Sequence, residues 1–162
     1  MRLVVSMIVA ATPFASWALS LQPAQQTVRP NVVLIITDDM GYADIGVYGA
    51  KDIRTPNIDG LARDGIRLTD FYANAVVCTP TRAALLTGRY QHRYGLETPL
   101  PNATDQGLPS TGHSLPRLLK NNGYATALVG KWHLGYRPEH SPILHGFDYF
   151  FGFKAGYTDY YR

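Results

Sequence analysis

The sequence predicts an α/β fold built on a mostly parallel sheet. Two apolar runs without polar alternation, residues 31–36 (NVVLII) and 124–129 (YATALV), indicate strands that are covered on both faces. Segments with helix start and stop signals lie between them, so strands and helices alternate as they do in βαβ units. We therefore expect a sheet with helices on both faces.

Two carboxylates follow the first expected strand. Asp38 and Asp39 come directly after it, and Gly41 then breaks the chain. Ligands of open α/β sheets bind at the carboxyl ends of the strands. Adjacent carboxylates repel each other unless a cation such as Ca²⁺ or Mg²⁺ collects them, although one of the two could instead cap a turn. The pair alone is weak evidence for a metal.

A short amphipathic helix is predicted next. Thr55 and Pro56 form a cap and first-turn pair, and Gly65 is the stop signal. The apolar face of this helix would consist of Ile58, Leu61 and Ala62. A brief strand over residues 66–73 (IRLTDFYA) would lead from there toward Cys78.

A second helix begins around Cys78. Thr79 and Pro80 open it, and Gly88 ends it. Backbone N–H groups and the helix dipole favour negative charge at a helix N-terminus. The position of Cys78 therefore suits an anionic group.

The rest of the chain repeats the pattern. Residues 98–112 are polar and rich in turn residues, which predicts a surface loop, and Ser114 then caps a third helix that Gly123 stops. The strand over 124–129 follows, and Lys131 and His133 come just after its end. They would lie at the same edge of the sheet as the carboxylates.

Composition fits one folded domain. The chain has 162 residues, 46% of them hydrophobic and 17% charged, with a net charge of +3 and no runs of like charge. This spread of charge argues against a nucleic-acid groove. We find no internal repeat and no second domain.

The first residues are typical of a secretory signal peptide. Arg2 precedes an apolar stretch that is too short for a membrane span and is interrupted by Pro13. We assign residues 1–18 to the signal, with cleavage possible up to residue 20, and 19–30 to a flexible lead. A buried N-terminal helix is the less favoured alternative, because the run has no polar face or capping pattern. The protein would be secreted or periplasmic, or lysosomal in a eukaryote.

Cys78 is the only cysteine. Exported domains usually pair their cysteines, so an unpaired one in an oxidising compartment needs an explanation. It could be buried and inert, or it could be consumed by chemistry.

Its neighbours resemble the signature of the sulfatase family. Residues 78–82 (CTPTR) carry the family's cysteine, proline and arginine, with Thr81 where serine is most usual, and 83–89 (AALLTGR) continue the likeness. A second family signature resembles residues 123–133 (GYATALVGKWH). The likeness covers nearly everything after residue 30. The segments TGRYQHRYGL, GKWHLG and GFDYFFG look closest to the arylsulfatase B (N-acetylgalactosamine 4-sulfatase) branch.

The resemblance implies a fold, an activity and cofactors. Residues 31–162 would be the N-terminal part of an alkaline-phosphatase-like domain that hydrolyses sulfate esters, with sulfated glycans as one substrate class. A maturation enzyme would oxidise Cys78 to formylglycine. Asp38, Asp39 and residue 78 would bind Ca²⁺, or Mg²⁺ in its place.

It also implies roles for three basic residues. Arg82 and Lys131 would hold the aldehyde hydrate and the sulfate charge, and His133 would assist expulsion of sulfate. Outside these motifs all three would be interpreted as solvated, paired or hydrogen-bonded structural residues. The remaining histidines are interpreted as surface or packing residues, with His113 near the pocket: His92, His113, His140 and His145.

Other functions stay open. The resemblance implies a further Asp–Asn pair of metal ligands, a second histidine and a second lysine that these 162 residues do not supply. We therefore expect a truncated chain that is inactive alone. The alternatives are a phosphodiesterase or phosphonate hydrolase of the same fold, and a non-catalytic exported module that binds anions.

Overall fold

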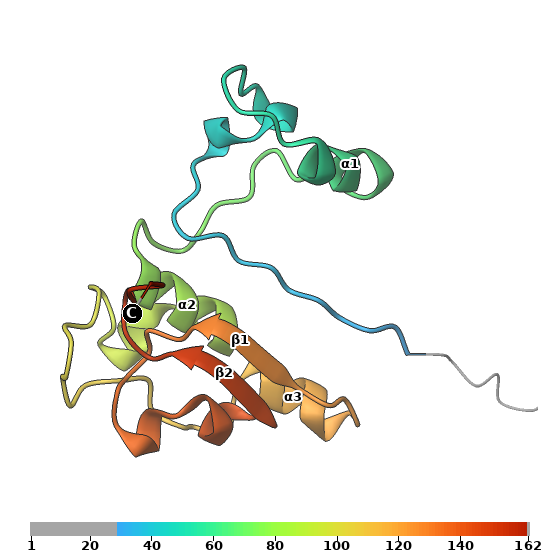
Figure 1. The fold of residues 1–162 in the computed structure, drawn as a ribbon. Coiled ribbons are helices and arrows are strands. Elements are labelled where there is room, and N and C mark those ends of the chain that lie inside the picture. Colours follow the sequence, from blue (N-terminus) through green and yellow to red (C-terminus); the bar gives the residue numbers. More distant parts are fainter. Residues whose placement is uncertain (1–28, 162) are drawn as a thin grey trace, which may run out of the picture. The chain divides into compact units, whose positions relative to one another are not determined.

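The computed structural model describes residues 29–161 (Figure 1). The chain divides into two units, Met1–Ile36 and Thr37–Arg162, which we treat separately. The expected signal peptide, and all of the lead except residues 29 and 30, lie outside the described residues. Within 29–161, no helix is long and apolar enough to cross a membrane.

The expected strand over residues 31–36 is wrong. These residues form neither helix nor strand, and their side chains are exposed, including Val33 at 82% and Ile35 at 76%. A strand requires a backbone partner, and the two strands in the described part of the chain pair with each other. Residues 31–36 therefore have the composition of a buried strand but form no backbone ladder with another described segment.

The second unit contains three α-helices. They are α1 (Pro56–Asp64), α2 (Cys78–Thr87) and α3 (Leu115–Asn121). Ser114 caps α3 by accepting a hydrogen bond from the backbone N–H of Arg117 at 3.3 Å, as its sequence predicts. Gly88 ends α2 in the left-handed conformation with φ 64°, which glycine adopts without strain.

Helix α1 forms where expected, but its apolar face is not buried. Leu61 is 72% exposed. Polar contacts hold the helix to the 3-10 turn at Gly46–Tyr48. Thr55 accepts a hydrogen bond from the N–H of Gly46 at 2.8 Å, and Asp59 accepts one from the N–H of Val47 at 2.7 Å. The expected strand over 66–73 is also wrong, because these residues form no backbone ladder.

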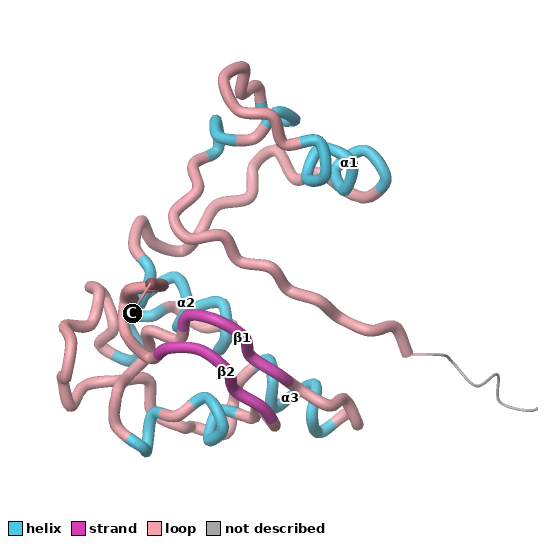
Figure 2. Tube along the Cα trace, in the orientation of Figure 1, coloured by secondary structure: helices cyan, strands magenta, loops and turns pink. Residues whose placement is uncertain are grey.

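A parallel two-stranded sheet joins β1 (Ala127–Lys131) and β2 (Tyr149–Phe153). Figure 2 shows the two strands side by side. The parallel pairing confirms the predicted sheet type. However, β1 begins three residues later than predicted, because Tyr124 still donates its N–H to Leu119 at the end of α3. Strand β2 was not predicted from the sequence.

One face of this sheet covers the core and the other is exposed. Leu128 and Phe150 pack against a buried cluster, whereas Val129 and Phe151 are 71% and 66% exposed. The cluster consists of Ala83, Leu96, Leu100, Leu108, Trp132, Leu134 and Phe147. Within the described residues the sheet is thus covered on one face, not on both as expected.

Short 3-10 turns connect these elements. They lie at Tyr42–Asp44, Gly46–Tyr48, Gln91–Tyr94 (η3), Pro138–His140 and Pro142–His145. The loop predicted over residues 98–112 contains no helix or strand, as expected.

Candidate active site

Cys78 and His133 form the centre of the candidate site. Cys78 is the first residue of α2 and is half-buried, and its Sγ lies 3.0 Å from Nδ1 of His133. The other ring nitrogen, Nε2, lies 3.0 Å from the carbonyl oxygen of Leu100. Because a carbonyl oxygen only accepts, Nε2 carries the hydrogen, and Nδ1 of a neutral ring is left to accept from the thiol.

The surroundings of His133 favour the neutral ring. The residue is 4% exposed, and this burial lowers the pKa of His133 below its ordinary value. The charges of Lys131 and Arg82 lower it further, while the hydrogen bond to Leu100 and the charge of Asp38 act in the opposite direction. A neutral imidazole with a free Nδ1 can accept a proton from the group at position 78.

The backbone of His133 is fixed from two sides. Its φ of 54° is in the left-handed region, which residues other than glycine rarely adopt. The buried hydroxyl of Thr79 donates to the carbonyl oxygen of His133 at 2.9 Å, and the N–H of His133 donates to Lys154 at 3.2 Å. Gly156 lies so close that an added Cβ would be 2.6 Å from Cε1 of the ring.

A charged group adjoins this centre through Arg82, one helical turn after Cys78. Nζ of Lys131 lies 2.9 Å and 3.3 Å from the two carboxylate oxygens of Asp38, and Nη2 of Arg82 lies 3.8 Å from Asp38 Oδ1. Arg82 also donates to the backbone oxygen of Lys131 at 2.7 Å. Two cations around one carboxylate leave a net positive charge that suits an anionic substrate group.

These contacts also set the charge of Asp38. Burial alone would raise the pKa of this carboxyl group, but the hydrogen bond and charge of Lys131, together with the charge of Arg82, hold the pKa below its ordinary value. Asp38 is therefore ionised at neutral pH. The side chains of Lys131 and Arg82 are only 10% and 12% exposed, so their orientations are well constrained.

Five of the six predicted site residues are thus connected. Cys78 contacts His133, and Asp38 contacts Lys131 and Arg82. Asp39 is exposed and makes no hydrogen bond or ion pair with the described residues. Their placement follows the predicted convergence, while their catalytic roles remain predictions.

The described residues do not complete a metal site. No group of three or more His, Cys, Asp or Glu side chains within 29–161 is arranged to hold a metal ion. Asp38 and Asp39 offer the oxygen atoms that Ca²⁺ prefers, but the carboxylate of Asp38 is occupied by two cationic side chains. The metal therefore stays a prediction.

Sequence reasoning missed the residues that position His133. Thr79 is fully buried and links three segments, because it donates to His133 and accepts from the N–H of Leu100 at 3.1 Å. The one feature of the sequence that could have indicated a role for Thr79 was its position next to Cys78. The role of Leu100 depends on a contact between residues far apart in the chain, which no local pattern reveals.

The other histidines lie outside this site. His92 is exposed and lies 3.7 Å from Glu97, His140 and His145 contact backbone carbonyl groups, and burial lowers the pKa of His145. Their interpretation as surface or packing residues is confirmed. His113 lines a separate hollow between α2 and α3.

Comparison with known proteins identifies the family. Residues 30–162 match the sulfatase family. N-acetylgalactosamine-6-sulfatase of Rattus norvegicus is 46% identical over 143 residues, which cover 83% of this chain and 27% of that protein. The chain thus spans about a quarter of the length of this relative.

Solved structures agree. The crystal structure of Ps i-CgsB superposes with a TM-score of 0.76 at 46% identity, covering 79% of this chain and 29% of that one. BT4656 in complex with its substrate D-glucosamine-2-N,6-O-disulfate gives a TM-score of 0.63 at 36% identity, covering 76% and 23%. The chain belongs to the sulfatase family and has its alkaline-phosphatase-like fold.

Proposed function

We propose that the protein containing this chain hydrolyses sulfate esters of sugars, using an aldehyde formed at Cys78. The observation that supports this most directly is the contact between Cys78 Sγ and His133 Nδ1 beside the half-buried cations Lys131 and Arg82. The names of the relatives point to the substrate class, since one acts on N-acetylgalactosamine 6-sulfate by name and another binds a sulfated glucosamine.

The thiol of Cys78 stands where the aldehyde would be. A maturation enzyme, using an external oxidant, would oxidise the Cβ–SH group to an aldehyde with loss of the sulfur. One hydroxyl of the hydrated aldehyde would then attack the sulfur of the substrate, and the bond from that sulfur to the sugar oxygen would break as the sugar alcohol leaves. The half-buried position of Cys78 at the start of α2 supports this assignment, because the helix N-terminus stabilises negative charge at that point.

The neighbouring side chains have separate tasks. Arg82 and Lys131 bind the sulfate group and stabilise the charge that develops on its oxygens. Asp38 orients Lys131 through their ion pair. His133 accepts a proton at position 78 through Nδ1 when sulfate is expelled, and Thr79 and Leu100 hold its ring in place.

Calcium, magnesium, secretion and the signal peptide remain parts of this proposal. Asp38, Asp39 and residue 78 are the residues that would contribute to a metal site. The signal assigned to residues 1–18 would direct the protein to the periplasm, the exterior or a lysosome. In that compartment an unpaired Cys78 is best explained by its conversion.

Mass spectrometry of the tryptic peptide covering residues 68–82 tests the proposal. Protein from the native host, or co-produced with a maturation enzyme, should show the mass loss expected when a thiol becomes an aldehyde. Release of sulfate from a sulfated N-acetylgalactosamine should accompany it in the native protein and fall to background in Cys78→Ala. An unmodified thiol in native material would exclude the aldehyde route.

Phosphate-ester substrates provide the second arm of the test. Sulfate and phosphate groups are similar in shape and differ mainly in charge. Preferential hydrolysis of a phosphodiester, with the aldehyde present, would assign the protein to the phosphodiesterase alternative.

A further inference from the structure

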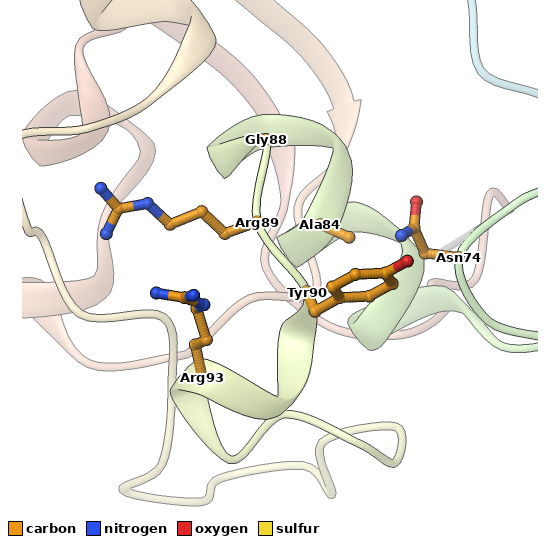
Figure 3. Close-up of a pocket in the computed structure, with 6 residues that line it drawn as sticks. All are labelled: Asn74, Ala84, Gly88, Arg89, Tyr90 and Arg93. Atoms are coloured by element: carbon orange, nitrogen blue, oxygen red, sulfur yellow. The ribbon is translucent and has the colours of Figure 1, made fainter.

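Two arginines after α2 share an open hollow. Arg89 and Arg93 line this arginine hollow, whose volume is about 510 Å³. The remaining lining residues are Asn74, Ala84, Gly88 and Tyr90. Figure 3 shows the two guanidinium groups extending toward the same side, with the Tyr90 ring and Asn74 on the opposite side, near Ala84.

Neither guanidinium group has an acidic partner among residues 29–161. Arg82 and Arg137, in contrast, pair with Asp38 and Asp105. Glu97, which follows η3, lies 3.7 Å from His92. Two like charges in one hollow repel each other, and an anion between them would replace this repulsion with attraction.

The lining supplies donors and no competing carboxylate. Each guanidinium group can donate two parallel hydrogen bonds to the oxygens of one anion. The Tyr90 hydroxyl and the Asn74 amide lie on the opposite side in Figure 3, so the two guanidinium groups are the donors that an anion between them would contact. Tyr90 is 68% exposed, so its ring is also accessible to a ligand. The volume falls within the range of about 300–1,000 Å³ common for small-molecule sites.

The hollow is distinct from the site around Cys78. Cys78 opens α2, whereas Gly88 and Arg89 follow its end. Ten helical residues separate the two places, which at the α-helical rise corresponds to about 15 Å. A single sulfate group therefore cannot occupy both.

We propose that the arginine hollow is a second, non-catalytic anion site that binds a sulfate group, either free or carried on a sugar. Its preference for anions follows from Arg89 and Arg93, while the identity of the anion as sulfate rests on the proposed function. Free sulfate would be the product of the reaction. A sulfated sugar would be another unit of the same substrate class.

Calorimetric titration of the 162-residue chain tests this site. The titrants are sodium sulfate, galactose 6-sulfate and galactose, all at constant ionic strength because exposed charges are screened by salt. Losing the charged hydrogen bonds in Arg89→Gln/Arg93→Gln should weaken sulfate binding at least about tenfold. Arg89→Lys/Arg93→Lys keeps the charge without the planar donors, so its affinity for sulfate should fall between those of the wild type and the glutamine variant.

A matched control removes the same charge elsewhere. Lys51→Gln/Arg54→Gln changes two exposed cations outside the hollow and should bind sulfate like the wild type. If this control weakens binding as much as the Arg89/Arg93 variant does, attraction to net charge explains the data and the site is refuted. Selenate soaked into crystals of the wild type gives a second measurement, with anomalous density expected between Arg89 and Arg93.

A further variant separates this inference from the proposed function. Arg82→Gln/Lys131→Gln alters the candidate active site, and sulfate binding in the arginine hollow should survive it. Sulfate binding lost only in that variant would refute the hollow and leave the proposed function intact. If sulfate binding depends on Arg89 and Arg93 but the native protein carries no Cys78 aldehyde, the arginine hollow is supported and the proposed function is refuted. Tighter binding of galactose 6-sulfate than of free sulfate would identify the sugar as the source.

Discussion

Lys131 controls the charge of Asp38. Burial alone would raise the pKa of Asp38, but the amino group contacts both carboxylate oxygens and, together with the charge of Arg82, holds this pKa below its ordinary value of 3.8. A carboxyl group with a lowered pKa in the folded state stabilises the fold above pH 3.8, and this contribution is lost as the pH falls through the lowered value. The Asp38–Lys131 pair should therefore favour folding at neutral pH and not in strong acid.

Replacing Lys131 tests this directly. Lys131→Met removes the hydrogen bond and the charge but keeps the aliphatic chain, so the pKa of Asp38 should rise toward or above 3.8 under the remaining influence of burial. Carbon-13 NMR titration of the Asp38 carboxyl group measures the change. Lys51→Met, which alters an exposed lysine, should leave that titration unchanged, and an unaltered Asp38 curve in Lys131→Met would contradict the pairing.

At the scale of elements, Gly152 determines how closely β1 and β2 approach. It is in register with Gly130, and a Cβ added at Gly152 would lie 1.9 Å from the carbonyl oxygen of Gly130. No side chain fits there without moving the strand. Gly130 also has a positive φ, 111°, but a Cβ at that position would meet no atom within 4 Å.

The two glycines therefore predict different costs. Gly152→Ala combines a steric clash with an unfavourable φ and should lower the free energy of unfolding by about 3 kcal/mol or more. Gly130→Ala incurs only the backbone strain and should cost about 1–2 kcal/mol. Urea unfolding of both variants measures the difference, and equal losses would show that the contact does not limit the pairing.

Helices were predictable from sequence, and strands much less so. Start and stop signals such as Ser114 and Gly88 act within a few residues, so all three α-helices form close to the predicted bounds. Strands depend on partners elsewhere in the chain. The apolar runs at 31–36 and 66–73 find no ladder among the described residues, and β2 went unrecognised because its partner precedes it by about twenty residues.

The contacts expected among the candidate site residues form, although the strand expected before Asp38 does not. The sequence brought Asp38, Lys131 and Arg82 together through strand ends, and the structure joins them by ion pairs although 31–36 is not a strand. The family motifs identify Cys78 and His133 regardless of secondary structure. The hydrogen bonds of Thr79 and Leu100 that fix His133 depend on tertiary packing, which local sequence patterns do not describe.

At the scale of the whole molecule, one face of the sheet exposes apolar side chains among the described residues. Val129 and Phe151 are directly opposite each other in the register, and Tyr149 on the same face is 56% exposed. Within the described residues β1 has a backbone partner on one edge only. Exposed apolar strand surfaces with a free edge promote association between chains.

The isolated 162-residue chain should consequently self-associate. Val129→Lys/Phe151→Lys places two like charges on neighbouring strands of the exposed face, and the repulsion between them should shift the chain toward monomer in sedimentation velocity experiments across a concentration series. Leu61→Lys/Ile66→Lys adds the same charge at two exposed apolar residues outside the sheet and serves as the control. Both variants gain the same net charge. A shift toward monomer in Val129→Lys/Phe151→Lys but not in the control would identify the sheet face as the associating surface. Equal shifts in both variants would assign the change to general charge repulsion.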